Sequence, residues 1–251
     1  MIYNIEPLSS ISDNPLLWGG KAVWLMRLIN NGFLVPKGIV ISTTEYRLYR
    51  TKRLDFESFE TILEAQCNKI LGYGDNIIFR SSATIEGSND VACCGIFESY
   101  LYNPHMTYFQ NVVRVWDSLF DVDSICYLQQ SGVNIEDVAM SVIIQKLQYG
   151  TFSGVVQTYD TVNDVEQIIV DYSSDGIDAV VNGTSNANTI YINSHTGEIT
   201  HFSCANCLSE QTINHIRRDC VLAEKIFHSH FEFEIQITEN EIYYVQARSI
   251  L

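Results

Sequence analysis

Two segments near the end of the chain carry side chains suited to holding a metal ion and an anion. Residues 231–237, FEFEIQI, alternate apolar side chains with acidic or amide ones, and residues 241–248, EIYYVQAR, follow a short polar stretch. This alternation predicts two β-strands in a hairpin, each with one buried face. In the return strand it predicts that four side chains share one face: Ile242, Tyr244, Gln246 and Arg248.

A turn centred on Asn240 would set Glu234 directly across from Gln246. Cross-strand neighbours lie about 5 Å apart at Cβ, so a carboxylate and an amide oxygen would come side by side. Such oxygen ligands suit Mg²⁺, which takes one or two protein ligands and completes its shell with nucleotide phosphates. Arg248, further along the same strand, would reach a terminal phosphate with two N–H groups. The alternative is an ordinary edge hairpin with a solvated polar face.

Two more segments combine a cation with backbone suited to phosphate. Gly19, Gly20 and Lys21 open a predicted helix, and a helix N-terminus attracts phosphate, although the GxxxxGK[ST] spacing is absent. Arg80 ends a predicted strand and is followed by Ser81-Ser82-Ala83-Thr84 and a polar loop that reaches Gly95. The alternatives are a glycine turn before a helix with an exposed lysine, and a loop stabilised by Ser/Thr turns.

Two weaker patterns complete the candidate chemistry. Gln145 and Lys146 lie on a predicted strand whose backbone groups would read an adenine, or which is a simple core strand. His201, Cys204 and Cys207 form an HxxCxxC pattern that would supply three zinc ligands, but a structural zinc site needs four. Free thiols in a turn are therefore favoured over zinc.

Composition narrows the function classes. The formal net charge of −15 over 251 residues argues against nucleic acid and anionic membranes as partners, because both are negatively charged. No apolar run reaches about 18 residues, so no transmembrane helix is predicted. The first residues show no signal-peptide pattern, and the seven scattered cysteines fit reduced thiols. We therefore expect a cytoplasmic protein.

The secondary-structure elements predicted to position these residues are mostly helices in the first half of the sequence and mostly strands in the second half. Hydrophobic periodicity and capping residues predict helices at 19–31, after Ser42, at 56–70, 107–131 and 209–229. Strands are predicted at 39–41, 76–80, 138–147, 153–159, 165–171 and 189–193, with a TGE turn at 196–198 leading to a partner strand. This order indicates a single α+β unit, with approximate subdomains 1–135 and 136–251.

The candidate segments occur in an order that resembles a known family. The chain is similar to the ATP-binding domain shared by phosphoenolpyruvate synthase, pyruvate phosphate dikinase and rifampicin phosphotransferase, over essentially its whole length. The family's motifs are matched by Gly19-Gly20-Lys21, by Gly32 to Ile39, by Phe79 to Glu86, by Trp116 to Phe120, by Gln145 with Ser153-Gly154-Val155, and by Glu232 to Arg248.

The resemblance implies an ATP-grasp-like fold of two α/β subdomains with the nucleotide between them, and the cofactors ATP and Mg²⁺. It implies that Lys21 and Arg80 contact phosphate and that Glu234 and Gln246 bind the metal. Arg248 would support the transferred phosphate, so Lys21, Arg80 and Arg248 are the expected catalytic residues. The remaining expected nucleotide contacts are Gly95 and Ser99 in the phosphate loop, Gln145 and Lys146 beside the adenine, and Asp178 at the ribose.

The family's phosphorylatable histidine domain and its phosphoenolpyruvate or pyruvate domain have no counterpart within residues 1–251. We therefore expect an ATP-dependent phosphotransferase component that is incomplete without a partner. Its acceptor would be a histidine on a separate protein or a small molecule. The departures at Ala92 to Ile96 and at Asp178, which is one methylene shorter than the family's glutamate, leave the alternative of a non-catalytic nucleotide-binding module. The implied ATP-grasp fold leaves a further alternative, an ATP-grasp ligase.

Overall fold

The computed structural model describes residues 3–72, 76–86, 96–177, 180, 188–202 and 208–250. The chain forms two compact units. The first unit combines Met1–Asn31 with Pro36–Leu147, and the second combines Gly32–Val35 with Gln148–Leu251. The division falls after Leu147 rather than near residue 135, because the strand that ends at Lys146 pairs with strands of the first unit on both of its sides.

The first unit is built on a five-stranded sheet of order β1-β2-β5-β3-β4, in which neighbouring strands run antiparallel. Its strands are β1 (Ile5–Pro7), β2 (Gly38–Ile41), β3 (Ile77–Ala83), β4 (Ser99–Leu101) and β5 (Met140–Lys146). Its helices are α1 (Pro15–Trp18), α2 (Gly20–Asn30), α3 (Thr43–Arg50), α4 (Phe56–Leu71), α5 (Tyr108–Asp117) and α6 (Val122–Gln130).

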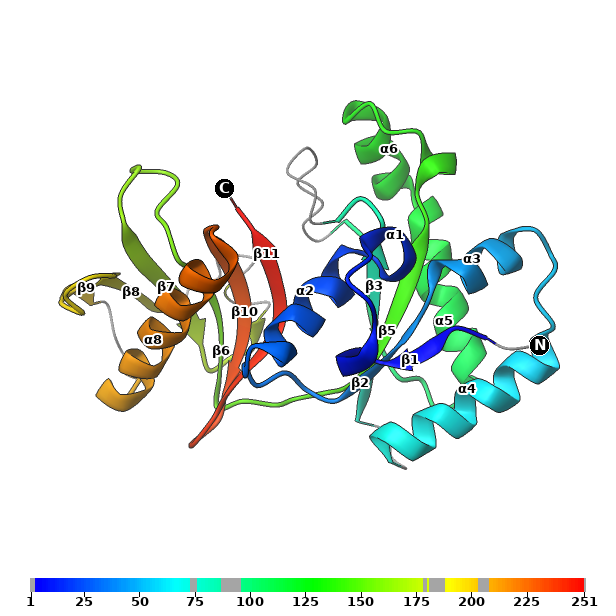
Figure 1. Cartoon of the computed structure of the whole chain (residues 1–251), viewed down its shortest axis with the longest axis horizontal. Helices are drawn as coiled ribbons and strands as arrows, with labels where there is room; N and C mark the ends of the chain where they lie inside the picture. The colour runs from blue at the N-terminus through cyan, green and yellow to red at the C-terminus, as the bar shows by residue number, and fades with distance from the viewer. Residues whose placement is uncertain are drawn as a thin grey trace. The chain divides into compact units, whose positions relative to one another are not determined.

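Helices α4 and α5 pack on one side of this sheet (Figure 1). Their apolar stripes and the strands share one core in which Phe59, Phe79 and Trp116 are fully buried. The indole Nε1 of Trp116 donates a hydrogen bond to the Met140 carbonyl at 3.1 Å, which ties α5 to β5. The helix therefore fixes the strand that carries Gln145.

Two predictions about this unit are corrected. The helix expected over 107–131 is two helices separated by a 3₁₀ turn at Ser118–Phe120, because Asp121 has an extended backbone that α-helix does not allow. The strand expected over 76–80 continues to Ala83, because Ser81, Ser82 and Ala83 pair with β5 instead of entering a loop.

The second unit contains a six-stranded antiparallel sheet of order β11-β10-β6-β7-β8-β9. Its strands are β6 (Phe152–Gln157), β7 (Gln167–Ser173), β8 (Asn188–Asn193), β9 (Ile199–Phe202), β10 (Phe231–Ile237) and β11 (Ile242–Ser249). Helix α8 (Glu210–Phe227) crosses this sheet and buries Ile213, Ile216, Cys220 and Ala223 (Figure 1). Ser209 caps it, as predicted, by accepting a hydrogen bond from the Thr212 amide at 3.1 Å.

Candidate nucleotide site

The hairpin of β10 and β11 pairs in the register that the sequence predicts at its centre. Glu234 is the cross-strand partner of Gln246, and Glu232 is the partner of Arg248. The alternation in β10 is also confirmed, since its phenylalanines and isoleucines are buried and its acidic and amide residues are half-buried. The hairpin therefore presents two carboxylates, an amide and a guanidinium together.

A β-bulge corrects the prediction for the return strand. Glu234 pairs with Gln246 but Ile235 pairs with Tyr244, so Val245 is an extra residue in β11. The bulge turns Ile242 and Tyr244 to the buried face, where Tyr244 is 2 % exposed and its ring packs edge-on against Phe233. Gln246 and Arg248 lie on the opposite, half-buried face, so the four side chains do not share one face.

Glu232 is a site residue for which the sequence suggested no role. Its Oε1 lies 2.7 Å from Nη2 of Arg248, and its Oε2 accepts a hydrogen bond from Nε2 of Gln157 at 3.0 Å. The ion pair is partly buried, with the Glu232 side chain 15 % exposed and that of Arg248 33 %. Glu232 therefore fixes the direction of the guanidinium. The period-two pattern that places Glu232 beside Glu234 is the signal that points to it.

The donor atoms of this face fit Mg²⁺. Glu234 offers a carboxylate and Gln246 an amide oxygen from adjacent strands, and Mg²⁺ needs only one or two such ligands when phosphates complete its shell. Among the described residues no group of three or more His, Cys, Asp or Glu side chains could hold a metal ion, so a site made entirely of protein ligands is not found there.

In the first unit, the Gly19-Gly20-Lys21 segment is fixed to the sheet by serines. Ser82 Oγ accepts a hydrogen bond from the Ala22 amide at 3.0 Å and donates one to the Trp18 carbonyl at 3.1 Å, and Ser141 also donates to that carbonyl. Gly19 has φ +75°, and a Cβ there would lie 2.0 Å from the Ser82 carbonyl oxygen. Only glycine allows this approach, which sets the start of α2 against β3.

The Lys21 side chain is paired with Glu86. Its Nζ lies 3.0 Å from Glu86 Oε1 and 3.3 Å from Ser81 Oγ. Both ends of the ion pair are buried, at 11 % exposure for Lys21 and 6 % for Glu86. The lysine predicted to contact phosphate is thus paired with a carboxylate from the segment that follows β3. Glu86 belongs to the FRSSATIE segment, but the sequence suggested no role for it.

The sheet also brings together Arg80 and Ser99. They are direct cross-strand partners on β3 and β4, and Lys21 contacts Ser81, the residue next to Arg80. Arg80 is 9 % exposed, whereas Ser99 is exposed. Three of the residues predicted to bind phosphate therefore lie at or beside the middle of β3.

Gln145 and Lys146 follow at the end of β5. Gln145 is 1 % exposed and its Nε2 donates a hydrogen bond to the Pro36 carbonyl at 2.9 Å, while Lys146 is exposed. This hydrogen bond gives Gln145 a structural role in closing β2 onto β5; its contact with adenine stays a prediction. Gly95, Asp178, Cys204 and Cys207 lie outside the described residues.

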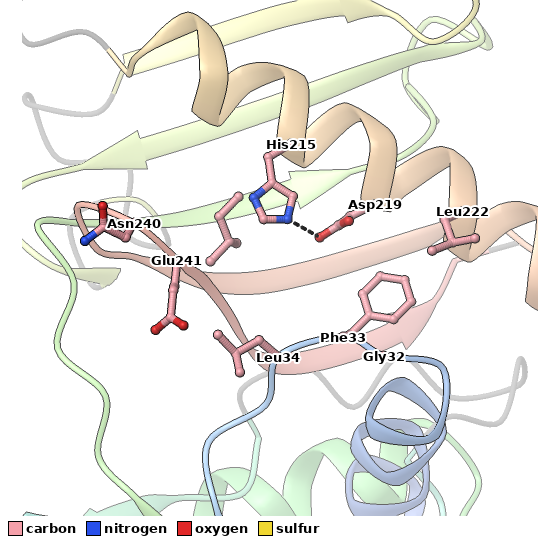
Figure 2. Close-up of a pocket in the computed structure, with 9 residues that line it drawn as sticks. Gly32, Phe33, Leu34, His215, Asp219, Leu222, Asn240 and Glu241 are labelled. Atoms are coloured by element: carbon pink, nitrogen blue, oxygen red, sulfur yellow. Dashed lines mark ion pairs between the residues drawn. The ribbon is translucent and has the colours of Figure 1, made fainter.

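The second unit contains a pocket of about 250 Å³ next to α8 (Figure 2). Phe33, Leu34 and Leu222 form its apolar wall, and His215 and Asp219 face it from one side of α8, with His215 Nε2 3.5 Å from Asp219 Oδ2. Asp219 Oδ2 also accepts a hydrogen bond from the Tyr244 hydroxyl at 2.7 Å. Burial raises the pKa of Asp219 despite this hydrogen bond and the nearby His215 and Arg218.

None of the predicted site residues that the structure describes lines this pocket. It lies beside Tyr244, on the face of β11 that the bulge turns away from Gln246 and Arg248. Within the second unit, the pocket is therefore separate from Glu234, Gln246 and Arg248.

Comparison with known proteins identifies the family to which the chain belongs. Residues 57–206, more than half of the chain, match the family described as pyruvate phosphate dikinase, AMP/ATP-binding domain. The chain belongs to this family. The match includes Arg80, Gln145 and the strands β6, β7, β8 and β9 of the second sheet.

Similar proteins of this family carry related names. A probable phosphoenolpyruvate synthase of Methanothermobacter thermautotrophicus is 23 % identical over 247 residues, covering 82 % of this chain and 36 % of that protein. One of Archaeoglobus fulgidus is 32 % identical, covering 68 % and 28 %. A rifampicin phosphotransferase of Bacillus cereus is 25 % identical, covering 68 % and 24 %. The chain thus spans little more than a third of these relatives, or less.

Among solved structures, a D-alanine–D-alanine ligase of Bacillus anthracis aligns over 92 % of this chain and 55 % of its own, with 12 % identity and a TM-score of 0.44. One of Helicobacter pylori aligns over 92 % and 54 %, with 9 % identity and a TM-score of 0.44. The family membership and the two helix-covered antiparallel sheets confirm the expected α+β, ATP-grasp-like fold. The place of the nucleotide stays a prediction. No helix in the described part of the chain is long and apolar enough to cross a membrane.

Proposed function

We propose that this chain binds Mg-ATP and passes a phosphoryl or pyrophosphoryl group from it to an acceptor. The observation that carries the proposal is the pairing of Glu234 with Gln246 beside the Glu232–Arg248 ion pair. A carboxylate, an amide oxygen and a fixed guanidinium on adjacent strands are the groups that an Mg-bound polyphosphate requires. Membership of an AMP/ATP-binding domain family supports the same conclusion.

Each unit contributes its own set of groups. In the second unit, Glu234 and Gln246 would hold Mg²⁺, and Arg248 would bind the transferred phosphate with its N–H groups. In the first unit, Lys21 and Arg80 would bind phosphate oxygens, and Ser99, Gly95, Gln145 and Lys146 would make further nucleotide contacts. In the second unit, Asp178 would contact the ribose.

Catalysis would consist of positioning the reactants and neutralising charge, because the protein itself forms few or no covalent bonds in phosphoryl transfer. Glu234 and Gln246 would hold Mg²⁺, which when bound would neutralise part of the phosphate charge. Arg248 would stabilise the charge that develops on the transferred group, and its ion pair with Glu232 would keep it oriented before the reaction. Lys21 and Arg80 would hold the phosphates that are left behind.

The acceptor is a histidine of a partner protein or a small molecule, and the expected cytoplasmic location is part of the same proposal. The similarity to enzymes named phosphoenolpyruvate synthase and rifampicin phosphotransferase supports an acceptor of one of these two kinds. We propose that the chain works together with a partner that carries or binds the acceptor.

The test is to incubate the purified chain with ATP and Mg²⁺ and to identify the products by phosphorus NMR, first alone and then with fractionated lysate. AMP with phosphate supports pyrophosphoryl chemistry, and ADP with a phosphorylated product supports a simple kinase. ADP with an amide product would instead identify an ATP-grasp ligase. Tight ATP binding with no turnover under any condition would identify a non-catalytic nucleotide-binding module.

A further inference from the structure

The ion pair between Lys21 and Glu86 is fixed at both ends. The Glu86 carboxylate is held by its own segment, since Oε2 accepts a hydrogen bond from the Ala83 amide at 2.7 Å, which leaves Oε1 for Lys21 at 3.0 Å. At the other end, Ser82 and Ser141 anchor the backbone on both sides of Lys21, at the Trp18 carbonyl and the Ala22 amide. Both members of the ion pair are therefore restrained by hydrogen bonds of their own segments.

Burial makes this pair unlike a surface salt bridge. The side chains are 11 % and 6 % exposed, so both charges have lost most of their hydration. The loss of hydration offsets much of the attraction in such pairs, and a buried ion pair is weak evidence for a contribution to stability. A role that depends on where the ammonium is placed accounts for the arrangement better.

The geometry leaves the lysine suited to a third partner. An ammonium group has three N–H donors, and Nζ donates one hydrogen bond, to Ser81 Oγ at 3.3 Å. Its contact with Glu86 Oε1 at 3.0 Å is an ion pair without hydrogen-bond geometry. No third partner of Lys21 Nζ is found among the residues that the structure describes. Protein kinases use the same device, in which a glutamate orients the lysine that binds the ATP phosphates.

We propose that Glu86 is a positioning residue: it holds the Lys21 ammonium in a fixed direction so that a phosphate oxygen of ATP binds to an ordered donor. This inference rests on the proposed function, in which Lys21 contacts phosphate. A free lysine side chain loses rotamer entropy when it binds, and Glu86 removes that loss from the binding step. Glu86 itself does not touch the nucleotide.

The test is a double-mutant cycle on the full chain with Glu86→Gln and Lys21→Ala. Glutamine keeps the size of the side chain and an acceptor for the Ala83 amide, but removes the charge that orders Lys21. The probe is the β,γ-imido analogue of ATP with Mg²⁺, measured by calorimetry. We expect Lys21→Ala to weaken binding about 10- to 100-fold, as for a lost charge-assisted hydrogen bond. Glu86→Gln should weaken it about tenfold by itself.

The cycle separates positioning from a structural role. If Glu86 acts through Lys21, Glu86→Gln changes affinity less than about twofold in the Lys21→Ala background. A full, additive effect in that background overturns the inference while leaving the proposed function in place. Tighter binding by Glu86→Gln also overturns it, because Glu86 would then compete with phosphate. An unchanged affinity in Lys21→Ala overturns both the phosphate role of Lys21 and the inference.

Two controls keep the result interpretable. Glu64→Gln makes the same change at an exposed position of α4 and should leave affinity unchanged. Thermal unfolding reports whether each variant is folded. If Glu86→Gln does not fold, Glu86→Asp takes its place in the same cycle, since it keeps the charge but shortens the reach to Lys21. Its effect should also vanish in the Lys21→Ala background, and persistence there would contradict the proposal.

Discussion

Arg248 and Glu232 face each other across the terminal hairpin, with Nη2 of the arginine 2.7 Å from Oε1 of the glutamate. Along the two strands, this pair lies two residues from Glu234 and Gln246, on the same face of the sheet. The guanidinium is therefore oriented by a neighbour that is itself bound to Gln157. An arginine held in this way can receive a phosphate without first ordering its own side chain.

The first prediction concerns Arg248. Arg248→Ala should lower ATP turnover about 10²- to 10³-fold, because the variant removes a donor aimed at developing charge. Arg248→Lys should recover little of this activity, since an ammonium cannot make two parallel hydrogen bonds to one phosphate. Turnover is followed by phosphorus NMR. Arg218→Ala, which removes an exposed arginine of α8, is the matched control, and equal losses in both variants would contradict the assignment.

The second prediction concerns the proposed metal ligand. Glu234→Ala should raise the Mg²⁺ concentration needed for half-maximal ATP binding at least about tenfold, because a carboxylate ligand is lost. Titrating Mg²⁺ at constant nucleotide and following binding by calorimetry measures the shift. Glu239→Ala changes a carboxylate in the exposed turn of the same hairpin and should not alter the Mg²⁺ dependence. An unchanged Mg²⁺ requirement in Glu234→Ala would remove Glu234 from the site.

The hairpin is the part of the site that could be predicted best from the sequence. A turn centred on Asn240 predicts Glu234 opposite Gln246, and this pair is found. The strands reach it only through the β-bulge at Val245, since nearer the turn Ile235 pairs with Tyr244. The bulge could not be predicted, because no local signal distinguishes Val245 from its neighbours. The bulge turns Tyr244 inward, where its hydroxyl binds Asp219 and its ring meets Phe33, and both contacts come from distant segments.

Contacts between distant segments also explain what was missed in the first unit. Nothing periodic links Lys21 with Glu86, and their pairing depends on the way α2 is fixed against β3 by Ser82. The Ser-Ser-Ala run reads locally as the start of a loop, yet its backbone pairs with β5. Family resemblance selects the correct segments, but it does not supply their hydrogen bonds.

The third prediction tests the close approach at Gly19. Gly19→Ala should lower the free energy of unfolding by more than about 2 kcal/mol, because the new Cβ would meet the Ser82 carbonyl and the positive φ is strained. Gly72→Ala is the matched control: its φ is +79°, but no atom of the described residues lies within 4 Å of a Cβ placed there. That variant should lose only about 1 kcal/mol from backbone strain. Urea unfolding measures both, and equal losses would show that the contact with Ser82 is unimportant.

The fourth prediction concerns Asp219 beside the α8 pocket. Burial raises its pKa above the ordinary 3.8, so the folded chain holds this proton to a higher pH than the unfolded chain does. The contribution of a raised pKa to stability is complete below the unfolded value and is lost as pH rises through the folded value. The free energy of unfolding of the wild type, relative to Asp219→Asn, should therefore fall as pH rises from about 4.

Asparagine keeps an acceptor for the Tyr244 hydroxyl and has no charge to lose hydration, so it isolates the titration of this one carboxyl. Urea unfolding of both chains at intervals from about pH 4 to 7 measures the difference. Asp123→Asn, at an exposed position of α6, controls for the loss of one negative charge in a chain of net charge −15. A difference between wild type and Asp219→Asn that grows with pH would mean that His215 and Arg218 stabilise the carboxylate more than burial disfavours it.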